Sequence, residues 1–414
     1  KTSKRFPLVG PDRLSPADGV VRERTDRSLL VFVLSVFFVN RLLVLLAAAY
    51  AMRDQWPALG FGRFLREVAI SNFYRWDSGW YGIIAEKGYE LKATAFFPLF
   101  PMLIAGVQAV FGTSAAFAGW LVSNFAFLLM LAAAFRLLRL DYAERDARRI
   151  VWMIALYPTS YYFGAVYTES LFLLFTVLAL HAMRTRRWGY AGAAGFFASV
   201  TRNTGVFLTI AYALEVLRIE RWRDLFDFVR NPFRRLQANG WRHLWWVLVI
   251  PLPFFLYMGY LFLRFGDPFA FASVQEQFGR SFLNPFVTLY EGYRMTGGWM
   301  LHKGIDWFFG YFFVEFLFVT LTIVVLVTSF RNMRLAYWLI LLYSFFIPLT
   351  APAHGEVKDY FVSYSRYSMV IFPLYIGLYE LVKRWRFGYW LVQCVFVSLL
   401  LILVCAWSQG KWIA

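Results

Sequence analysis

One stretch in the first third of the chain places an acid among aromatic side chains. It runs Asn72-Phe-Tyr-Arg-Trp-Asp-Ser-Gly-Trp-Tyr81, and its acid is Asp77. Indole and phenol rings with a polar edge prefer the depth at which hydrocarbon meets water. A carboxylate at that depth is placed to act as a general base on a substrate that is part lipid and part sugar. Trp76, Trp80 and Tyr81 would offer ring faces to the sugar.

Other polar residues that could bind such a substrate come from segments that the span pattern below places on the same side of a membrane. They are Lys87 in a first long loop, Glu169 in a short turn, Arg202 and Asn203 in a hairpin turn, Gln275 and Arg280 in a second long loop, and His354 and Arg366 before a late apolar run. A phosphate leaving group needs positive charge, which arginine or a divalent metal such as Mg²⁺ or Mn²⁺ supplies. We therefore predict that Arg366, Arg202 and Arg280 hold a phosphate.

Glu169 is expected to assist Asp77, either by orienting the acceptor or by helping to hold a divalent ion. Each of these side chains also has a purely structural interpretation. Asp77 could tie down its loop through Arg75, and Glu169 could cap a helix that starts at Ser170. Arg202 could satisfy hairpin carbonyls, Arg366 could anchor a helix at the interface, and the three aromatic residues could be interfacial packing.

The composition predicts an integral membrane protein with many spans. Of the 414 residues, 60% are hydrophobic and 16% are charged, whereas soluble domains carry about 25% charged residues. The net charge of +17 lies in short clusters between apolar runs. That distribution fits the positive-inside rule of membrane proteins better than a nucleic-acid surface, and no nucleic-acid partner is predicted.

The apolar runs predict an all-α polytopic fold of about eleven spans, with the N-terminus inside and the C-terminus outside. Residues 1–27 would be a cytoplasmic tail, 28–408 a single transmembrane domain, and 409–414 an external tail. The domain would include external loops at 52–114 and 265–306. The spans are expected near 28–51, 115–138, 149–165, 166–183, two within 189–217, and then 243–264, 307–329, 334–350, 367–383 and 388–408.

Several local features follow from the same pattern. Residues 98–112 are too few to span easily, and the charges of the following loops favour a helix on the outer surface. Asn40 and Arg41 lie near the middle of the first span, where we expect a buried ion pair. The turn of the 189–217 hairpin should contain Gly205 at positive φ. Residues 218–242 are expected to form a cytoplasmic amphipathic helix on the anionic leaflet.

The ordered motifs FYRWDSGWY, IAEKGY, AFFPLFP, LYPTSYYFGAVYTESLF, TRNTG and FGDPFAF resemble those of the PIG-V-type, or GPI mannosyltransferase II-like, mannosyltransferases, over about residues 28–383. The resemblance implies the GT-C glycosyltransferase fold, with juxtamembrane helices and an essential acid in the first external loop. It implies a polyprenyl- or dolichyl-phosphate mannose donor and inversion at the anomeric carbon. The loop acid of the family falls on Asp77 and a second acid on Glu169. The acceptor does not carry over.

The sequence therefore predicts a mannosyltransferase that acts at the external or lumenal face on a lipid-linked or glycan acceptor. Its location would be a bacterial or archaeal plasma membrane, or the endoplasmic reticulum membrane in a eukaryote. The alternative is a transporter or flippase of a lipid-linked sugar, which would account for Arg41 but predicts polar residues at mid-membrane on several helices.

Overall fold

The computed structural model describes residues 16–232, 241–303, 310–354 and 358–412, and these residues are almost entirely helical. The predicted all-α fold is confirmed. The ends of the two predicted tails, residues 1–15 and 413–414, lie outside the described residues. The part of the predicted tail that is described, from Pro16 onward, is already helical and continues into the first span.

The helices are α1 (Pro16–Ala51), α2 (Trp56–Ala69), α3 (Asp77–Lys87), α4 (Leu99–Phe111), α5 (Ala115–Leu138), α6 (Glu144–Ala155), α7 (Glu169–Arg184), α8 (Trp188–Thr201), α9 (Leu208–Val216), α10 (Trp222–Arg230), α12 (Leu252–Phe265), α13 (Ala270–Ser273), α14 (Pro285–Lys303), α15 (Tyr311–Ser329), α16 (Leu335–Leu349), α17 (Tyr364–Ser368), α18 (Phe372–Val382) and α19 (Gly388–Ser408). The strands β1 (Ala353–His354) and β2 (Lys358–Asp359) pair antiparallel.

Helices that are long and apolar enough to cross a membrane identify an integral membrane protein. There are five in the described residues, at Arg27–Ala51, Ala115–Leu138, His243–Phe265, Tyr311–Ser329 and Gly388–Ser408. Shorter apolar helices cover Leu99–Phe111, Asn203–Val216, Leu335–Leu349 and Phe372–Val382. The predicted number of eleven spans is not confirmed by these lengths. The expected span at 367–383 begins only at Phe372, because α17 forms a separate short helix before it.

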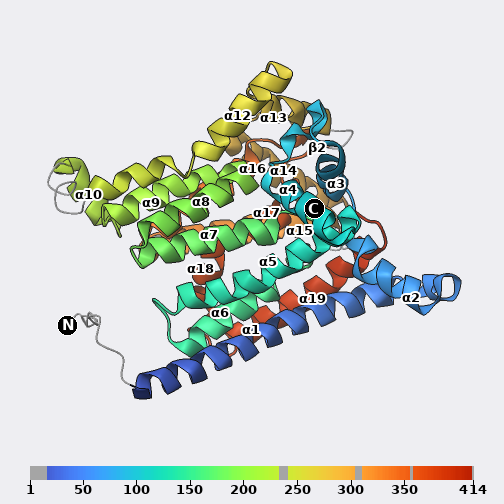
Figure 1. Ribbon diagram of the computed structural model, residues 1–414, viewed down its shortest axis with the longest axis horizontal. Coiled ribbons are helices and arrows are strands. Elements are labelled where there is room, and N and C mark those ends of the chain that lie inside the picture. Colours follow the sequence, from blue (N-terminus) through green and yellow to red (C-terminus); the bar gives the residue numbers. More distant parts are fainter. Residues whose placement is uncertain (1–15, 233–240, 304–309, 355–357, 413–414) are drawn as a thin grey trace.

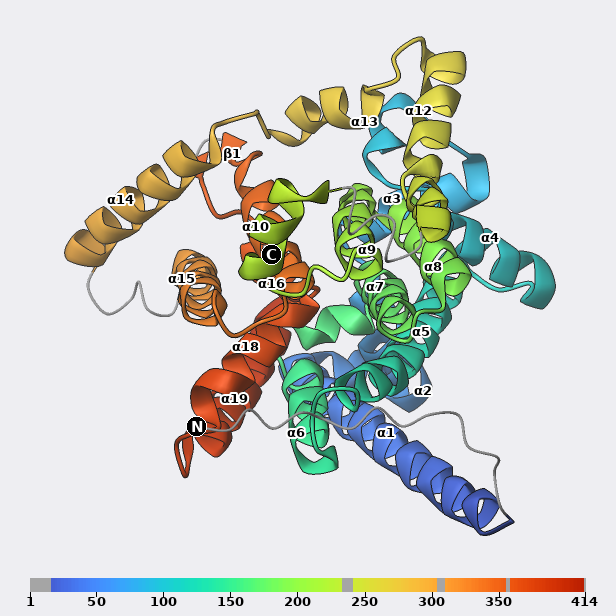
Figure 2. The same cartoon turned by 90° about the vertical axis from the view of Figure 1, so that its left-hand side faces the viewer.

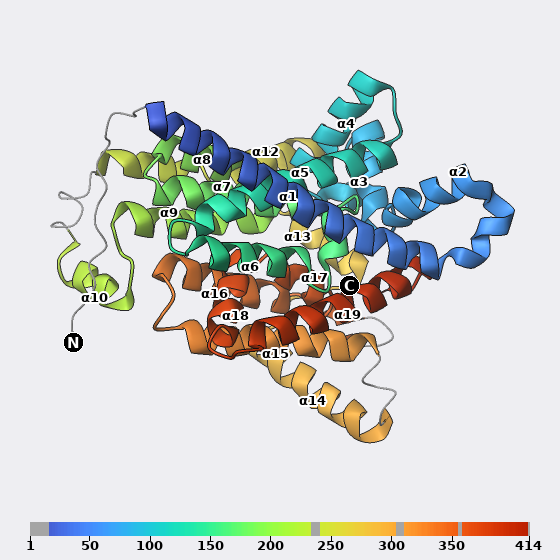
Figure 3. The ribbon, with the colours of Figure 1, turned by 90° about the horizontal axis from the view of Figure 1, so that it is seen from below.

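The helices form a bundle with two different ends. In Figure 1 the first loop, with α2, α3 and α4, gathers at the right-hand end, together with α13 and β2, while α10 lies at the opposite end. Figure 3 shows the same division from below. The second predicted loop is not wholly irregular: α14 lies on the outside of the bundle beyond α15 and α16 (Figure 2). The two predicted external loops therefore share the right-hand end.

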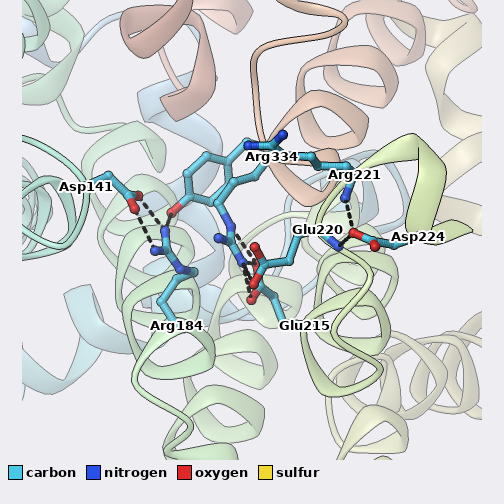
Figure 4. Close-up of polar contacts among 8 residues, drawn as sticks. Asp141, Arg184, Glu215, Glu220, Arg221, Asp224 and Arg334 are labelled. Carbon is cyan, nitrogen blue, oxygen red and sulfur yellow. Dashed lines mark hydrogen bonds and ion pairs between the residues drawn. The ribbon is translucent and has the colours of Figure 1, made fainter. Parts of the chain in front are cut away.

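A network of ion pairs joins four helical connections at the end of the bundle predicted to be cytoplasmic. Arg184 on α7 meets both carboxylate oxygens of Asp141 at 2.5 and 2.7 Å. Arg334, before α16, contacts Glu215 on α9 and also Glu220, each at 3.1 Å (Figure 4). Because long-range pairs with several partners hold their geometry better than isolated surface pairs, this network fixes the end of the bundle opposite Asp77.

The chain between α6 and α7 is wholly buried and lacks regular structure apart from a 3-10 helix at Ser160–Phe163. The first span supplies its polar partners. Asn40 donates to the carbonyl of Ala155 at 2.6 Å, and Arg41 donates to the carbonyl of Ser160 at 3.2 Å. Arg41 also reaches Asn124 at 3.4 Å. The expected ion pair is therefore wrong: within the described chain the partners of Arg41 are amide and carbonyl oxygens. Irregular backbone is tolerated at membrane depth where protein buries it.

The hairpin within 189–217 turns where it was expected, between α8 and α9. Its glycine is required for a different reason from the one predicted. Gly205 does not have positive φ. Instead, a Cβ at this position would lie 2.4 Å from the backbone carbon of Ala198 and 2.5 Å from the nitrogen of Ser199. The turn therefore packs backbone against backbone on α8, and any side chain would force the two apart.

Candidate functional site

Two acids and two arginines from distant parts of the chain form one continuous set of ion pairs. Arg366 on α17 contacts Oδ2 of Asp77 through Nη1 at 2.9 Å and Oε1 of Glu169 through Nε at 3.2 Å. Arg202, which follows α8, contacts the same oxygen of Glu169 at 3.0 Å. The four predicted residues Asp77, Glu169, Arg202 and Arg366 thus lie together. Three of them come from the ends of helices, which converge at the same end of the bundle.

Burial differs sharply among these four side chains. Glu169 is 1% exposed and Arg366 is 9% exposed, whereas Asp77 is 26% exposed. Arg202 is intermediate at 16%. A buried ion is tolerated when partners and hydrogen bonds compensate its lost hydration. Asp77 is therefore the carboxylate of the pair that a molecule from outside can reach, and Glu169 lies behind the arginines.

The backbone that presents Asp77 is strained. Trp76 has φ 51° and ψ −115°, outside the regions that residues with a Cβ adopt easily, and α3 begins at the next residue. Such conformations cost about 1–3 kcal/mol and persist where the surroundings hold them. Here the carbonyl of Arg75 accepts a hydrogen bond from the Tyr167 hydroxyl at 3.1 Å, and the Arg75 side chain donates to the carbonyl of Trp407 at 3.0 Å. Arg75 is thus bound to α19 and not to Asp77.

The acid at the start of α7 has a favourable helix end and one unused oxygen. Glu169 is the first residue of α7, which places its negative charge at the positive end of the helix dipole. Its Oε1 meets both arginines, while its Oε2 has no hydrogen-bond partner among the described residues. Glu169 is therefore arranged to hold two guanidinium groups side by side.

The short helix that carries Arg366 is held in place by another buried acid, Glu315. Glu315 on α15 accepts hydrogen bonds from the backbone nitrogen and from the hydroxyl of Ser365, both at 2.7 Å. The guanidinium carbon of Arg366 also lies 5.1 Å from the ring centre of Tyr167, a cation–π contact. Although burial acts to lower the pKa of Arg366, Asp77 and Glu169 outweigh it and raise the pKa, so the guanidinium stays charged.

A third arginine approaches the cluster from the second long loop. Arg280 pairs with Ala353 in an isolated β-bridge, and its Nη1 lies 3.4 Å from the hydroxyl oxygen of Tyr367. Arg280 also faces Asp359 on β2, whose pKa burial raises to about 6 although Tyr311, Phe361 and Arg280 act to lower it. The bridge to Ala353 therefore brings Arg280 to the ring of Tyr367, the residue that directly follows Arg366.

The aromatic candidates divide into two groups. Tyr81 is buried near Asp77 and Glu169, and its phenol shares a hydrogen bond with Thr168. Burial and then the two carboxylates raise the pKa of Tyr81, so the phenol keeps its proton. Trp80, half-buried, lies against Phe96 and Phe278.

Trp76, by contrast, packs edge-on against Trp407, with the ring centres 4.2 Å apart, and against Trp412. Its ring therefore takes part in the attachment of the first loop to α19.

The remaining four predicted residues are not brought into contact with the ion-pair cluster by any described interaction. Lys87, in the last turn of α3, and Asn203, at the start of the turn after Arg202, are exposed. The amide of Gln275 donates to the carbonyl of Phe271 at 3.4 Å. His354 is exposed on β1, and its ring packs edge-on near Tyr360. These four residues lie in segments that carry cluster residues or follow them, but they do not contact the cluster.

Three residues near the site were not singled out by the sequence. Tyr367 and Glu315 lie in or next to predicted spans, where a tyrosine or a single acid resembles ordinary packing. Lys92 stands over the rings of Trp80 and Phe278, at 5.8 and 5.2 Å from their centres. The signal available for Tyr367 was its place directly after Arg366.

The described residues do not fit a divalent ion held by the protein. The two candidate ligands, Asp77 and Glu169, are joined by the guanidinium of Arg366, which occupies the position that a bridging ion would need. No group of three or more His, Cys, Asp or Glu side chains with metal-binding geometry occurs in the described ranges. Positive charge at this site is supplied by arginine.

Comparison with known proteins gives one relative by sequence. The chain is 25% identical over 254 residues to GPI alpha-1,6-mannosyltransferase 2 of Homo sapiens. The alignment covers 58% of this chain and 49% of that protein. The chain thus spans about half the length of this relative. No family model matches.

Two crystal structures of the Archaeoglobus fulgidus oligosaccharyltransferase align over most of the chain. One was determined with zinc and sulfate: it gives a TM-score of 0.41 at 11% identity and covers 89% of this chain and 53% of that one. The other is tethered to an acceptor peptide. It gives a TM-score of 0.41 at 13% identity and covers 91% of this chain and 55% of that one. The predicted resemblance to GPI mannosyltransferase II-like proteins is confirmed, as a resemblance, by the human relative.

Proposed function

We propose that this protein is an inverting GT-C glycosyltransferase that transfers mannose from a polyprenyl- or dolichyl-phosphate mannose to a lipid-linked or glycan acceptor. The observation that carries the proposal is the linked set Asp77–Arg366–Glu169–Arg202 at one end of a membrane helix bundle. Arg280, which faces Asp359, brings a third guanidinium group to the side of this set. The name of the human relative supports mannose as the sugar.

The arginines would bind the donor phosphate. A guanidinium binds a phosphate through parallel hydrogen bonds, and negative charge grows on the phosphate as the bond to the sugar breaks. Fixed cations at that position stabilise the transition state more than the ground state. Glu169 is well placed to hold Arg202 and Arg366 at the spacing of two phosphate oxygens, because one of its oxygens contacts both.

Binding of the phosphate would also release the base. In the structure Nη1 of Arg366 lies 2.9 Å from Oδ2 of Asp77. A phosphate that takes over the Nη1 donor of Arg366 would free this oxygen for an acceptor hydroxyl. The hydroxyl then gives its proton to Asp77 and attacks the anomeric carbon, and the electron pair of the breaking sugar–oxygen bond leaves with the phosphate. This single displacement inverts the anomeric centre.

The external or lumenal face is proposed for this reaction. The arginine-rich connections, including those at Arg184 and Arg334, lie at the other end of the bundle, where the positive-inside rule places the cytoplasm. A polyprenyl chain stays in the bilayer because exposing it costs about 0.8 kcal/mol per CH₂, so its phosphate must be met near the interface. Residues at helix ends, such as Glu169 and Arg202, suit that depth.

The transporter alternative loses its main support. Asn40 and Arg41 were the polar residues at mid-span that favoured a transport path, and both are occupied with the backbone between α6 and α7. A structural use for this pair removes the mid-span polar residues on which a transport path would rest.

The test is turnover of the purified protein with polyprenyl-phosphate mannose and a panel of lipid-linked and soluble glycan acceptors, with GDP-mannose as the negative donor. A new glycosidic bond of inverted configuration, formed from the lipid donor alone, is expected. Movement of labelled lipid across liposomes without any new glycosidic bond would instead establish the transporter.

A further inference from the structure

One tyrosine lies at the meeting point of the three arginines. The guanidinium carbons of Arg366, Arg202 and Arg280 lie 5.3, 5.4 and 6.0 Å from the ring centre of Tyr367. These arginines come from α17, from the turn after α8 and from the second long loop, so the ring is where three separate segments converge. The hydroxyl of Tyr367 is also within 3.4 Å of Nη1 of Arg280.

Tyr367 differs from its neighbours along the chain in its exposure. From Phe361 to Met369 every residue is buried except Tyr367, which is partly exposed. Arg202 and Arg280 are partly exposed as well. Tyr367, Arg202 and Arg280 are therefore each partly accessible, whereas Arg366 is buried.

The convergence needs a physical reason, because three guanidinium groups within about 6 Å of one point repel one another. Asp77 and Glu169 neutralise two of the charges, and Asp359 faces the third, Arg280. The negative face of an aromatic ring supplies further attraction to each cation, and such contacts are stronger where water is excluded. Tyr367 thus contacts all three arginines through one ring.

We propose that Tyr367 is a positioning residue that holds the three arginines around the phosphate of the donor, and that its ionisation sets the alkaline limit of the reaction. This inference rests on the proposed function. The neutral phenol leaves the arginines free to bind an anion and can donate its own proton to a phosphate oxygen. The phenolate is an anion in the same place, so it would satisfy the arginines itself and compete with the donor.

The charges that face Tyr367 determine the direction of the effect. Burial acts to raise the pKa of the Tyr367 phenol, but Arg280, Arg366 and Arg202 outweigh it, and Asp77 opposes them only in part, so the pKa lies below its ordinary value of 10. Activity and donor binding should therefore be intact below that pKa and fall as the pH rises through it. The donor is a phosphodiester with a single constant negative charge over this range, so its own titration does not contribute.

The experiment measures the affinity for polyprenyl-phosphate mannose between pH 7 and pH 10.5, with the purified protein in nanodiscs, for the wild type, Tyr367→Phe and Tyr367→Leu. Tyr367→Phe keeps the ring and removes the ionisable group. It should bind the donor within about threefold of the wild type at pH 7 and lose the alkaline fall. Tyr367→Leu removes the ring and should weaken binding on the order of tenfold at every pH, the scale of several lost cation–π contacts.

The matched control is Tyr364→Phe, on the same short helix, whose ring is fully buried and packs against Phe345. It should show the wild-type pH profile. An alkaline fall that is unchanged in Tyr367→Phe, or a wild type that does not bind the donor, overturns the inference.

Turnover is measured on the same samples. A wild type that binds the donor with the expected pH profile but transfers no sugar overturns the proposed function and leaves the assignment of Tyr367 standing.

Discussion

Replacement of Asp77 by asparagine tests two proposals in one variant. The first is that Asp77 is the general base, and the second is that Arg366 passes from Asp77 to the donor phosphate. Asparagine keeps the shape of the side chain but does not accept the proton of the acceptor hydroxyl. A lost general base costs about 10²–10⁴ in rate, so we expect single-turnover transfer to fall by at least about 10²-fold. Donor binding should change in the opposite direction, because Asp77 holds Arg366 at 2.9 Å in the absence of substrate.

The size of the gain follows from that contact. A hydrogen bond between charged groups contributes about 1.5–3 kcal/mol and one to a neutral amide about 1 kcal/mol. Asp77 is 26% exposed, so screening by water keeps the difference well below its upper limit, at about 1 kcal/mol. That energy becomes available to the phosphate when the carboxylate is removed. We therefore expect Asp77→Asn to bind the donor about fivefold more tightly than the wild type.

The assay combines equilibrium binding of labelled polyprenyl-phosphate mannose with single-turnover transfer at saturating donor. The control is Asp54→Asn, the same chemical change at an exposed acid in the first loop, whose nearest cation, Arg53, is 3.9 Å away. It should leave both quantities unchanged. Transfer by Asp77→Asn at a rate near that of the wild type would refute its role as the base. Donor binding weaker than in the wild type would refute the exchange of Arg366 between Asp77 and phosphate.

Three further outcomes are expected. Arg366→Lys should transfer sugar more slowly than the wild type even at saturating donor, because the ammonium keeps the charge but loses the two-pronged contact; a wild-type single-turnover rate would make Arg366 only an anchor. Gly205→Ala should destabilise the protein by roughly 1–3 kcal/mol or more through its clash with the α8 backbone, measured as a lower midpoint of thermal unfolding, whereas Gly259→Ala, which meets nothing within 4 Å, should not lower it. In a cysteine-free background, Thr113→Cys should react with an impermeant reagent from outside and Arg145→Cys only after permeabilisation; the reverse pattern would show that residues 98–112 cross the membrane.

The sequence was informative about the class of protein and about the charged residues, for physical reasons. Hydropathy revealed the helical membrane fold because every backbone group in a bilayer must be paired internally. Charged residues such as Asp77 and Arg366 stood out because charges near apolar runs are costly unless they are used. Their mutual contacts, across 289 positions of the chain, depend on tertiary packing that no local pattern encodes.

The predictions that were wrong or incomplete also failed because they depended on tertiary packing. Gly205 reads as a turn residue in sequence, and only the packing of its turn on α8 shows that close approach is the requirement. Arg41 suggested an ion pair, because a carboxylate is the usual partner of a buried guanidinium, whereas an interrupted helix supplies carbonyl oxygens that serve as well. Tyr367 was overlooked, since its significance arises from three arginines brought from other segments.

The position of Arg41 constrains the order in which the protein can be assembled. The helix that carries it, α1, leaves the ribosome before its partners beyond its own helix, which lie at Asn124 and Ser160. An arginine at the centre of a new span opposes insertion by about 2.5–3.5 kcal/mol, which the apolar residues of α1 must overcome unaided. The guanidinium then stays without those partners until the irregular segment after α6 has been synthesised and packed. This helix therefore reaches its final packing only after segments that follow it in the chain have been made.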